Sequence, residues 1–213
     1  MADTAVMAAR AIGSGAQEVV LASASRPRRD MLLRAGVRLR VDPAGVDEDE
    51  VKASLRIEGA RAEQAAETLA ELKAQQVSRR HPRHLVIGAD QILDCDGRWF
   101  DKPPDRAAAA GHLRALSGKT HGLATAACVL REGTRIWHHV AVARLTMRPL
   151  NDAFIDAYLD AVGDDVLASV GAYQLEGLGV QLFSRVDGDF FTVLGLPLLP
   201  LLGFLRGHGV VPE

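Results

Sequence analysis

The stretch LVIGADQIL at residues 85–93 carries one carboxylate, Asp90, inside a largely apolar run. Its length and composition are typical of a buried strand, and the Asp96-Gly97 pair that follows predicts a tight hairpin turn. Burying an unpaired carboxylate is unfavourable, so Asp90 is expected to be paired, to bind a metal ion or to face a cleft. A functional role is therefore favoured over a structural one.

Apolar patterns on both sides of this stretch predict further strands and helices. Strands are predicted at residues 18–22, 37–41, 123–130 and 136–147, and helices at residues 27–36, 60–80, 106–116 and 153–161. Residues 180–186 and 190–194 flank a turn at Asp187-Gly188, and residues 193–205 indicate a strand end followed by a core helix. With no internal repeat and no linker, the pattern predicts an α/β fold with a mixed sheet flanked by helices.

Composition limits the classes of function. The chain has 213 residues and a formal charge of −2, so any phosphate binding must come from local Lys/Arg clusters and not from a basic surface. Two cysteines make neither a disulfide framework nor a zinc motif, and no signal peptide is expected. The run at residues 193–205 is shorter than the roughly 20 residues that span a bilayer. These features predict a cytoplasmic protein that binds neither membranes nor nucleic acid.

Two polar segments are candidates for a functional site. Ser23–Arg29 places two hydroxyls and several guanidiniums between a strand and a helix start, where phosphate binding and a solvated basic loop are equally plausible. The acidic run at residues 46–50 favours a solvated face or the first turn of a helix, although it could supply an oxygen ligand to a divalent cation. Alone, Lys73 reads as an exposed helix residue, Lys102 is uninformative, and the histidines indicate no zinc site.

Taken in order along the chain, nine short blocks resemble the Maf family of nucleotide pyrophosphatases. The blocks are LASAS at 21–25 with Arg28-Arg29, VDE at 46–48, LKA at 72–74, GAD at 88–90, Lys102-Pro103, LSG at 116–118 with His121, GAY at 171–173, Glu176-Gly177 and GLP at 195–197. Each block is weak singly, but the ordered set from about residue 19 to residue 207 is specific.

The resemblance implies a fold, an activity and a set of site residues. The implied fold is an elongated α/β structure with a central cleft, like that of inosine-triphosphate pyrophosphatase, with residues 1–16 as a flexible tail and residues 17–213 as one domain of two lobes. The implied activity is release of pyrophosphate from a nucleoside triphosphate with Mg²⁺ or Mn²⁺, by a homodimer. The implied residues are Asp90 as catalytic base, Glu48 and Asp90 as metal ligands, and Ser23, Arg28, Arg29, Lys73 and Lys102 as phosphate ligands.

Two departures from the commoner family pattern bear on the base. Arg26 and Pro27 separate Ser25 from Arg28, and Glu176 stands where the branch acting on thymidine and uridine triphosphates often has Gln. Both features, with Gln91 after Asp90, resemble the branch that acts on 7-methyl-GTP. A carboxylate can accept from both donors on the guanine edge, whereas it would repel the carbonyls of uracil. A dTTP/UTP pyrophosphatase, or a nucleotide-sensing protein associated with division, stays as the alternative.

Overall fold

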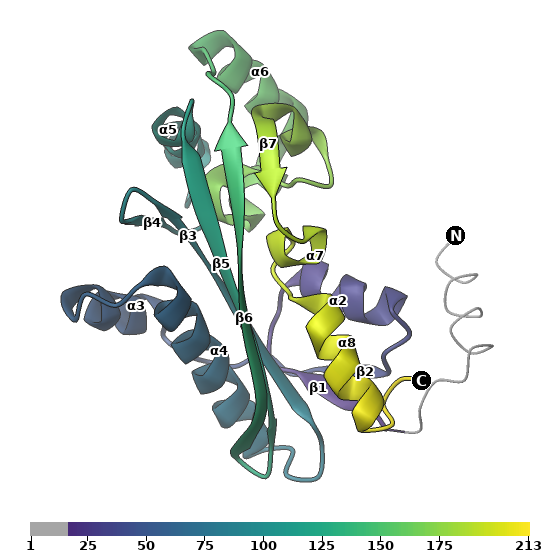
Figure 1. The fold of residues 1–213 in the computed structure, drawn as a ribbon. Coiled ribbons are helices and arrows are strands. Elements are labelled where there is room, and N and C mark those ends of the chain that lie inside the picture. Colours follow the sequence, from purple (N-terminus) through teal and green to yellow (C-terminus); the bar gives the residue numbers. More distant parts are fainter. Residues whose placement is uncertain (1–16) are drawn as a thin grey trace. The chain divides into compact units, whose positions relative to one another are not determined.

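The computed structural model describes residues 17–213 (Figure 1), so the predicted flexible tail at residues 1–16 lies outside the described residues. The strands are β1 (Val19–Leu21), β2 (Leu39–Val41), β3 (Val86–Cys95), β4 (Arg98–Phe100), β5 (Thr120–Arg131), β6 (Thr134–Met147) and β7 (Phe183–Asp187). The α-helices are α2 (Arg26–Arg34), α3 (Glu48–Ile57), α4 (Ala62–Ser78), α5 (Arg106–Leu116), α6 (Asp152–Val162), α7 (Phe190–Val193) and α8 (Leu198–Gly207). Three 3₁₀ segments complete the set: η1 (Gly163–Ala168), η2 (Val170–Ala172) and η3 (Leu178–Leu182).

Within residues 17–213, seven strands form one mixed sheet. The order is β2-β1-β3-β5-β6-β7, and β4 pairs with β3 outside this path. Strand β1 runs parallel to both β2 and β3, whereas β3–β4 and β6–β7 are antiparallel pairs. The predicted α/β fold with a mixed sheet flanked by helices is therefore confirmed. The elongated outline, the central cleft and the two-lobed single domain stay predictions.

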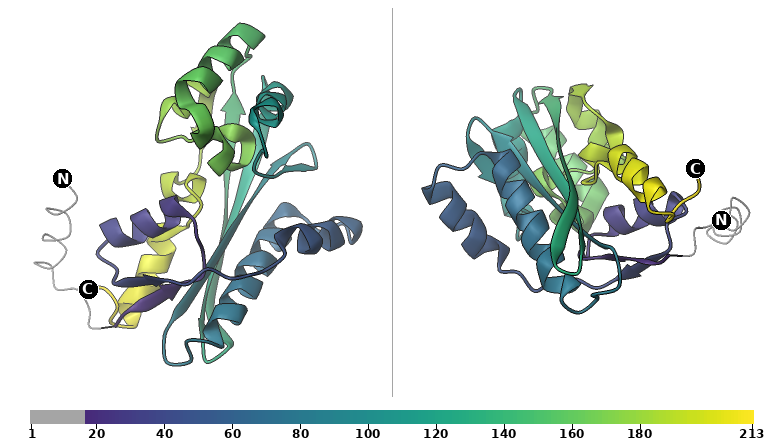
Figure 2. Two further views of the ribbon diagram at one scale, coloured as in Figure 1. Left: turned by 180° about the vertical axis from the view of Figure 1, so that it is seen from behind. Right: turned by 60° about the horizontal axis from the view of Figure 1, so that its bottom comes forward.

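The chain divides into two compact units. The first contains the described residues up to Asp90 together with Thr125–Ala141 and Gly195–Glu213. In this unit α4 covers one face of the sheet, and α2 and α8 cover the other (Figures 1 and 2). All three residues of β1 are fully buried. Helix α4 turns an apolar stripe inward that is mostly alanine: Ala65, Ala66, Leu69, Ala70 and Ala74. Small side chains allow a helix to approach a sheet closely.

The second unit contains Gln91–Ala124 and Val142–Leu194. Helix α5 packs against α6 and against the 3₁₀ segments η1 and η2. Its core gathers buried side chains from strands and helices, among them Leu93, Phe100, Leu113, Leu145 and Tyr158.

The structure decides two predictions about local structure, one for the acidic run at residues 46–50 and one for Val193. The acidic run begins helix α3, where the Asp47 side chain accepts a hydrogen bond from the Glu50 amide at 3.1 Å. The predicted strand end at Val193 is wrong, because this residue ends the short helix α7, although the core helix beyond it is confirmed as α8. The reason lies at Asp189, whose carboxylate accepts from the Thr192 amide at 2.8 Å and caps a helical turn. Among the described helices, none is both long and apolar enough to cross a membrane.

Candidate functional site

The close contact between α4 and β3 brings Lys73 to Asp90. Gly88 on β3 has no side chain to hold the helix off, and Asp90 lies two residues further along the same face of the strand. The Lys73 Nζ atom donates to Asp90 Oδ1 at 2.5 Å. Both side chains are buried, with 7% of Lys73 and 4% of Asp90 exposed, so the expectation of an exposed Lys73 is wrong. The expectation that Asp90 is paired is met.

Helix α3 adds a second carboxylate to the same ammonium group. Asp47 caps this helix, so Glu48 is its first residue. The Glu48 Oε1 atom lies 2.6 Å from Lys73 Nζ, and Glu48 Oε2 lies 3.8 Å from the Nζ of Lys52, one turn further along α3. Glu48 and Asp90, which lie 42 positions apart in sequence, thus meet on one lysine.

The two carboxylates suit a hard divalent cation. Asp90 Oδ2 is buried and has no hydrogen-bond partner within residues 17–213, so it keeps its capacity to accept a proton or bind a cation. Carboxylate oxygens are the ligands that Mg²⁺ and Mn²⁺ prefer, and Mg²⁺ is commonly held by one or two carboxylates together with substrate phosphates. The residues present therefore fit such an ion.

Arg28 ties three segments of the first unit together beside these carboxylates. Its Nε donates to the Gly195 carbonyl at 2.7 Å, and its Nη1 donates to the Ala89 carbonyl at 2.8 Å and to Ser23 Oγ at 3.2 Å. These bonds use three of the five guanidinium N–H groups. The two on Nη2 form no hydrogen bond with the described residues, which leaves them for a ligand. Arg28 is thus both a structural clamp and a donor.

The electrostatics of the cluster favour an ionised Glu48. Burial raises the pKa of Glu48, but the positive charges of Lys73, Lys52 and Arg28 together outweigh burial, and the net effect is a lowered pKa. Burial also lowers the pKa of Arg28, an effect that the nearby charges of Asp90 and Glu48 oppose. At neutral pH the cluster therefore presents an anionic Glu48 beside a guanidinium that remains protonated.

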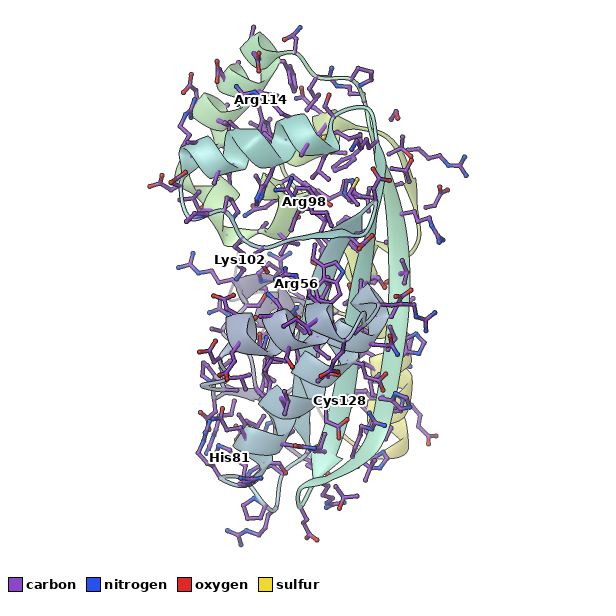
Figure 3. All side chains as sticks on the ribbon, turned by 90° about the vertical axis from the view of Figure 1, so that its left-hand side faces the viewer. Arg56, His81, Arg98, Lys102, Arg114 and Cys128 are labelled. Atoms are coloured by element: carbon purple, nitrogen blue, oxygen red, sulfur yellow. The ribbon has the colours of Figure 1, made fainter. Side chains whose placement is uncertain are left out.

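The structure brings five of the predicted residues together in the first unit: Ser23, Arg28, Glu48, Lys73 and Asp90. Arg29 lies on the same helix as Arg28, but its guanidinium pairs with the adjacent Asp30 at 2.8 Å. Lys102 and Glu176 belong to the second unit. Lys102 is exposed on the loop after β4 (Figure 3), and Glu176 is exposed in a turn before η3, with no ion pair to any described residue.

Sequence reasoning missed Lys52 as a member of this cluster. Lys52 is 8% exposed, and lysine is rarely so buried unless it is paired. A signal was present in the sequence, because Lys52 follows Glu48 by four residues and the two therefore share one face of a helix. The acidic run was read as a solvated face or the first turn of a helix, and no helix was predicted beyond it, so the spacing of Glu48 and Lys52 was not used.

Comparison with known proteins finds relatives that match most of this chain. A protein named nucleoside triphosphate pyrophosphatase from Paramagnetospirillum magneticum is 57% identical over 190 residues, covering 89% of this chain and 98% of that protein. Another of that name from Granulibacter bethesdensis is 51% identical over 191 residues, covering 90% and 97%. A protein named 7-methyl-GTP pyrophosphatase from Rhizobium etli is 51% identical over 194 residues, covering 91% and 98%.

The match to a family extends over nearly all described residues. Residues 18–208 match the family described as Maf-like protein, and this range contains every residue of the cluster around Lys73. The resemblance drawn from nine short blocks of sequence is thereby confirmed, and the chain belongs to the Maf-like protein family.

Proposed function

We propose that this protein hydrolyses a nucleoside triphosphate to the monophosphate and pyrophosphate. The observation that carries the proposal is that Glu48 and Asp90 both form ion pairs with the Lys73 ammonium group, with Arg28 nearby. Acidic groups that can hold a metal ion and orient water, next to cations that can neutralise phosphate, are the requirements of phosphoryl chemistry. Relatives with half or more of the same residues carry the name nucleoside triphosphate pyrophosphatase.

A divalent cation belongs to this proposal. Glu48 and Asp90 would hold it, and Mg²⁺ and Mn²⁺ both suit their oxygens. When bound, such an ion supplies positive charge that lowers the barrier to attack on phosphorus.

Asp90 is the proposed general base. Its Oδ1 is held by Lys73, and its Oδ2 has no partner within residues 17–213 and can accept a proton from water. The water oxygen then forms a bond to the α-phosphorus while the bond from that phosphorus to the bridging oxygen breaks, and pyrophosphate leaves. The free Nη2 groups of Arg28 suit the negative charge that develops on the phosphate oxygens. Ser23, Arg29, Lys73 and Lys102 keep their predicted role as phosphate ligands within this proposal.

Glu176 is the proposed contact to the base, with a preference for 7-methyl-GTP or another guanine-type nucleotide. The structure leaves its carboxylate exposed and without an ion pair to the described residues, so it is open to a ligand. N7-methylation makes guanine cationic and its N1–H more acidic, which strengthens a carboxylate contact. The relative from Rhizobium etli, named 7-methyl-GTP pyrophosphatase, supports the same preference. A preference for dTTP or UTP is the alternative, and the cytoplasmic location and the homodimer stay predictions.

A panel of nucleotides tests the proposed reaction. Canonical and modified triphosphates, including 7-methyl-GTP, UTP and dTTP, are incubated with the protein and Mg²⁺ or Mn²⁺, and pyrophosphate and orthophosphate are measured separately. Pyrophosphate released in equal amount to the monophosphate is the expected result. Orthophosphate with a diphosphate, or no turnover of any member of the panel, would contradict the proposal and favour a sensing role.

A further inference from the structure

The ammonium group of Lys73 occupies the position between the two carboxylates. Its Nζ lies 2.5 Å from Asp90 Oδ1 and 2.6 Å from Glu48 Oε1, so two of its three N–H groups are engaged. Both oxygens lie near one nitrogen and are therefore close to each other. Without a cation between them, two carboxylates at this separation, one of them 4% exposed, would repel each other strongly.

A divalent cation and this ammonium group compete for the same two side chains. If the ion took Asp90 Oδ1 and Glu48 Oε1, it would displace Lys73 directly. If it took the other two carboxylate oxygens, it would lie beside three positive side chains, since Lys73, Lys52 and Arg28 all act on Glu48. Either arrangement opposes metal binding to the protein alone.

A triphosphate removes this opposition. It carries several negative charges, and its oxygens can accept hydrogen bonds from an ammonium group as carboxylates do. When it binds, Lys73 can exchange a carboxylate for a phosphate oxygen, which releases a carboxylate to the metal ion. Binding of the ion and binding of the nucleotide then favour each other.

We propose that Lys73 is the internal counter-ion of the metal site, which holds Glu48 and Asp90 together until a metal–triphosphate complex arrives. This inference rests on the proposed function and adds an order of binding to it. Lys73 thus pairs with both carboxylates before substrate binds, and afterwards with Asp90 and a phosphate oxygen, having exchanged Glu48 for the phosphate. The protein without nucleotide binds divalent cations weakly because its own lysine occupies their place.

Mn²⁺ binding to the protein without nucleotide tests the role of Lys73. Free and bound Mn²⁺ are distinguished by electron paramagnetic resonance in the wild type, Lys73→Met and Lys73→Gln. Removing the ammonium group should tighten Mn²⁺ binding about tenfold, within the roughly 5- to 150-fold that coupled sites commonly show. Lys52→Met is the matched control, because Lys52 is equally buried but its Nζ lies 3.8 Å from the nearer Glu48 oxygen, against 2.6 Å for Lys73. Its Mn²⁺ affinity should change clearly less.

Thermal stability is a second measurement, which also serves a Lys73 variant that folds less well than the wild type. Without Lys73 the paired carboxylates lack their counter-ion, so Mn²⁺ should raise the melting temperature of Lys73→Gln more than that of the wild type. Equal Mn²⁺ affinities and equal thermal shifts in wild type and both Lys73 variants would overturn the counter-ion role. If wild-type turnover still required Mn²⁺, the proposed function would survive that result. Turnover that needs no divalent cation would overturn the metal site and the counter-ion role together.

Discussion

The backbone of Gly88 lies so close to Ala70 that a Cβ atom added to the glycine would be 2.1 Å from the Ala70 carbonyl oxygen. The same Cβ would lie 2.8 Å from the Cβ of Ala74. Both distances are shorter than van der Waals contact, so only glycine fits this position of β3. The close approach sets the separation of α4 from the strand, and thereby lets Lys73 on the helix reach Asp90 on the strand.

Replacing Gly88 by alanine should harm both stability and activity. The added methyl group must push α4 away from β3, and overpacking of this kind typically costs about 1–3 kcal/mol. Turnover should fall further than the loss of folded protein explains, because Lys73 and Asp90 move apart. Urea denaturation and steady-state kinetics measure the two effects. Gly111→Ala in α5 is the control: a Cβ there meets nothing within 4 Å, so it should stabilise the protein by about 0.4–1 kcal/mol and leave turnover unchanged.

Asp90→Asn tests the general base. The amide keeps the size of the side chain and can still accept a hydrogen bond from Lys73, but it cannot take a proton from water. Turnover should fall about 100- to 10,000-fold, while the circular dichroism spectrum stays that of the folded protein. Asp49→Asn is the matched control, because Asp49 is an exposed carboxylate beside Glu48 and should tolerate the change. Near wild-type turnover in a folded Asp90→Asn protein would show that another group accepts the proton.

Glu176→Gln separates recognition of the base from a role in the loop. An amide loses one acceptor and turns a donor toward the donors of guanine, which costs about 1–3 kcal/mol, or five- to 150-fold in selectivity. A competition between 7-methyl-GTP and UTP on both proteins measures the ratio, which should fall by that factor. In the alternative, Glu176 forms an ion pair with an arginine and thereby holds the conformation of its loop. The described residues show no ion pair between Glu176 and an arginine. The alternative would appear as an equal loss on both nucleotides.

His121 should make the stability of the protein depend on pH. Its Nε2 lies 2.7 Å from the Tyr173 hydroxyl oxygen, and burial lowers its pKa from 6.5 to about 4. Between these values the unfolded chain binds a proton that the folded protein does not, so the free energy of unfolding falls as pH falls. Between about pH 7 and pH 5, this one group should lower the free energy of unfolding by about 2 kcal/mol. Urea denaturation of wild type and His121→Gln at several pH values gives the free energy of unfolding of each. The wild type should lose more stability than the variant as pH falls, and parallel pH profiles would contradict the role of His121.

Most elements were predictable because their signals are local. Helix α5 matches its predicted range residue for residue, and Asp96-Gly97 forms the expected turn, with positive φ at both residues. Helix α7 was missed because the apolar residues that follow Asp189 suit a strand equally well, and the outcome depends on one capping hydrogen bond. A single side-chain bond of this kind has a weak signature in composition.

The site was predictable in its members but not in its connections. The order of short motifs indicated Glu48, Lys73 and Asp90, yet nothing in their spacing shows that one ammonium group joins both carboxylates. That contact depends on the packing of α3 and α4 and on the distance of α4 from β3. The burial of Lys73 and the bonds from Arg28 to the carbonyls of Ala89 and Gly195 are likewise tertiary. Helical periodicity alone placed Lys73 on a solvent-facing surface.

The position of bond cleavage tests the proposed reaction most directly. The protein is incubated with a nucleoside triphosphate in water labelled with heavy oxygen, and both products are analysed by mass spectrometry. Attack of water on the α-phosphorus, with Asp90 as base, should place one heavy oxygen in the monophosphate and none in the pyrophosphate. Label in the pyrophosphate would mean attack on the β-phosphorus, and label in orthophosphate would mean attack on the γ-phosphorus. Either result would contradict the reaction proposed for Asp90 and Glu48.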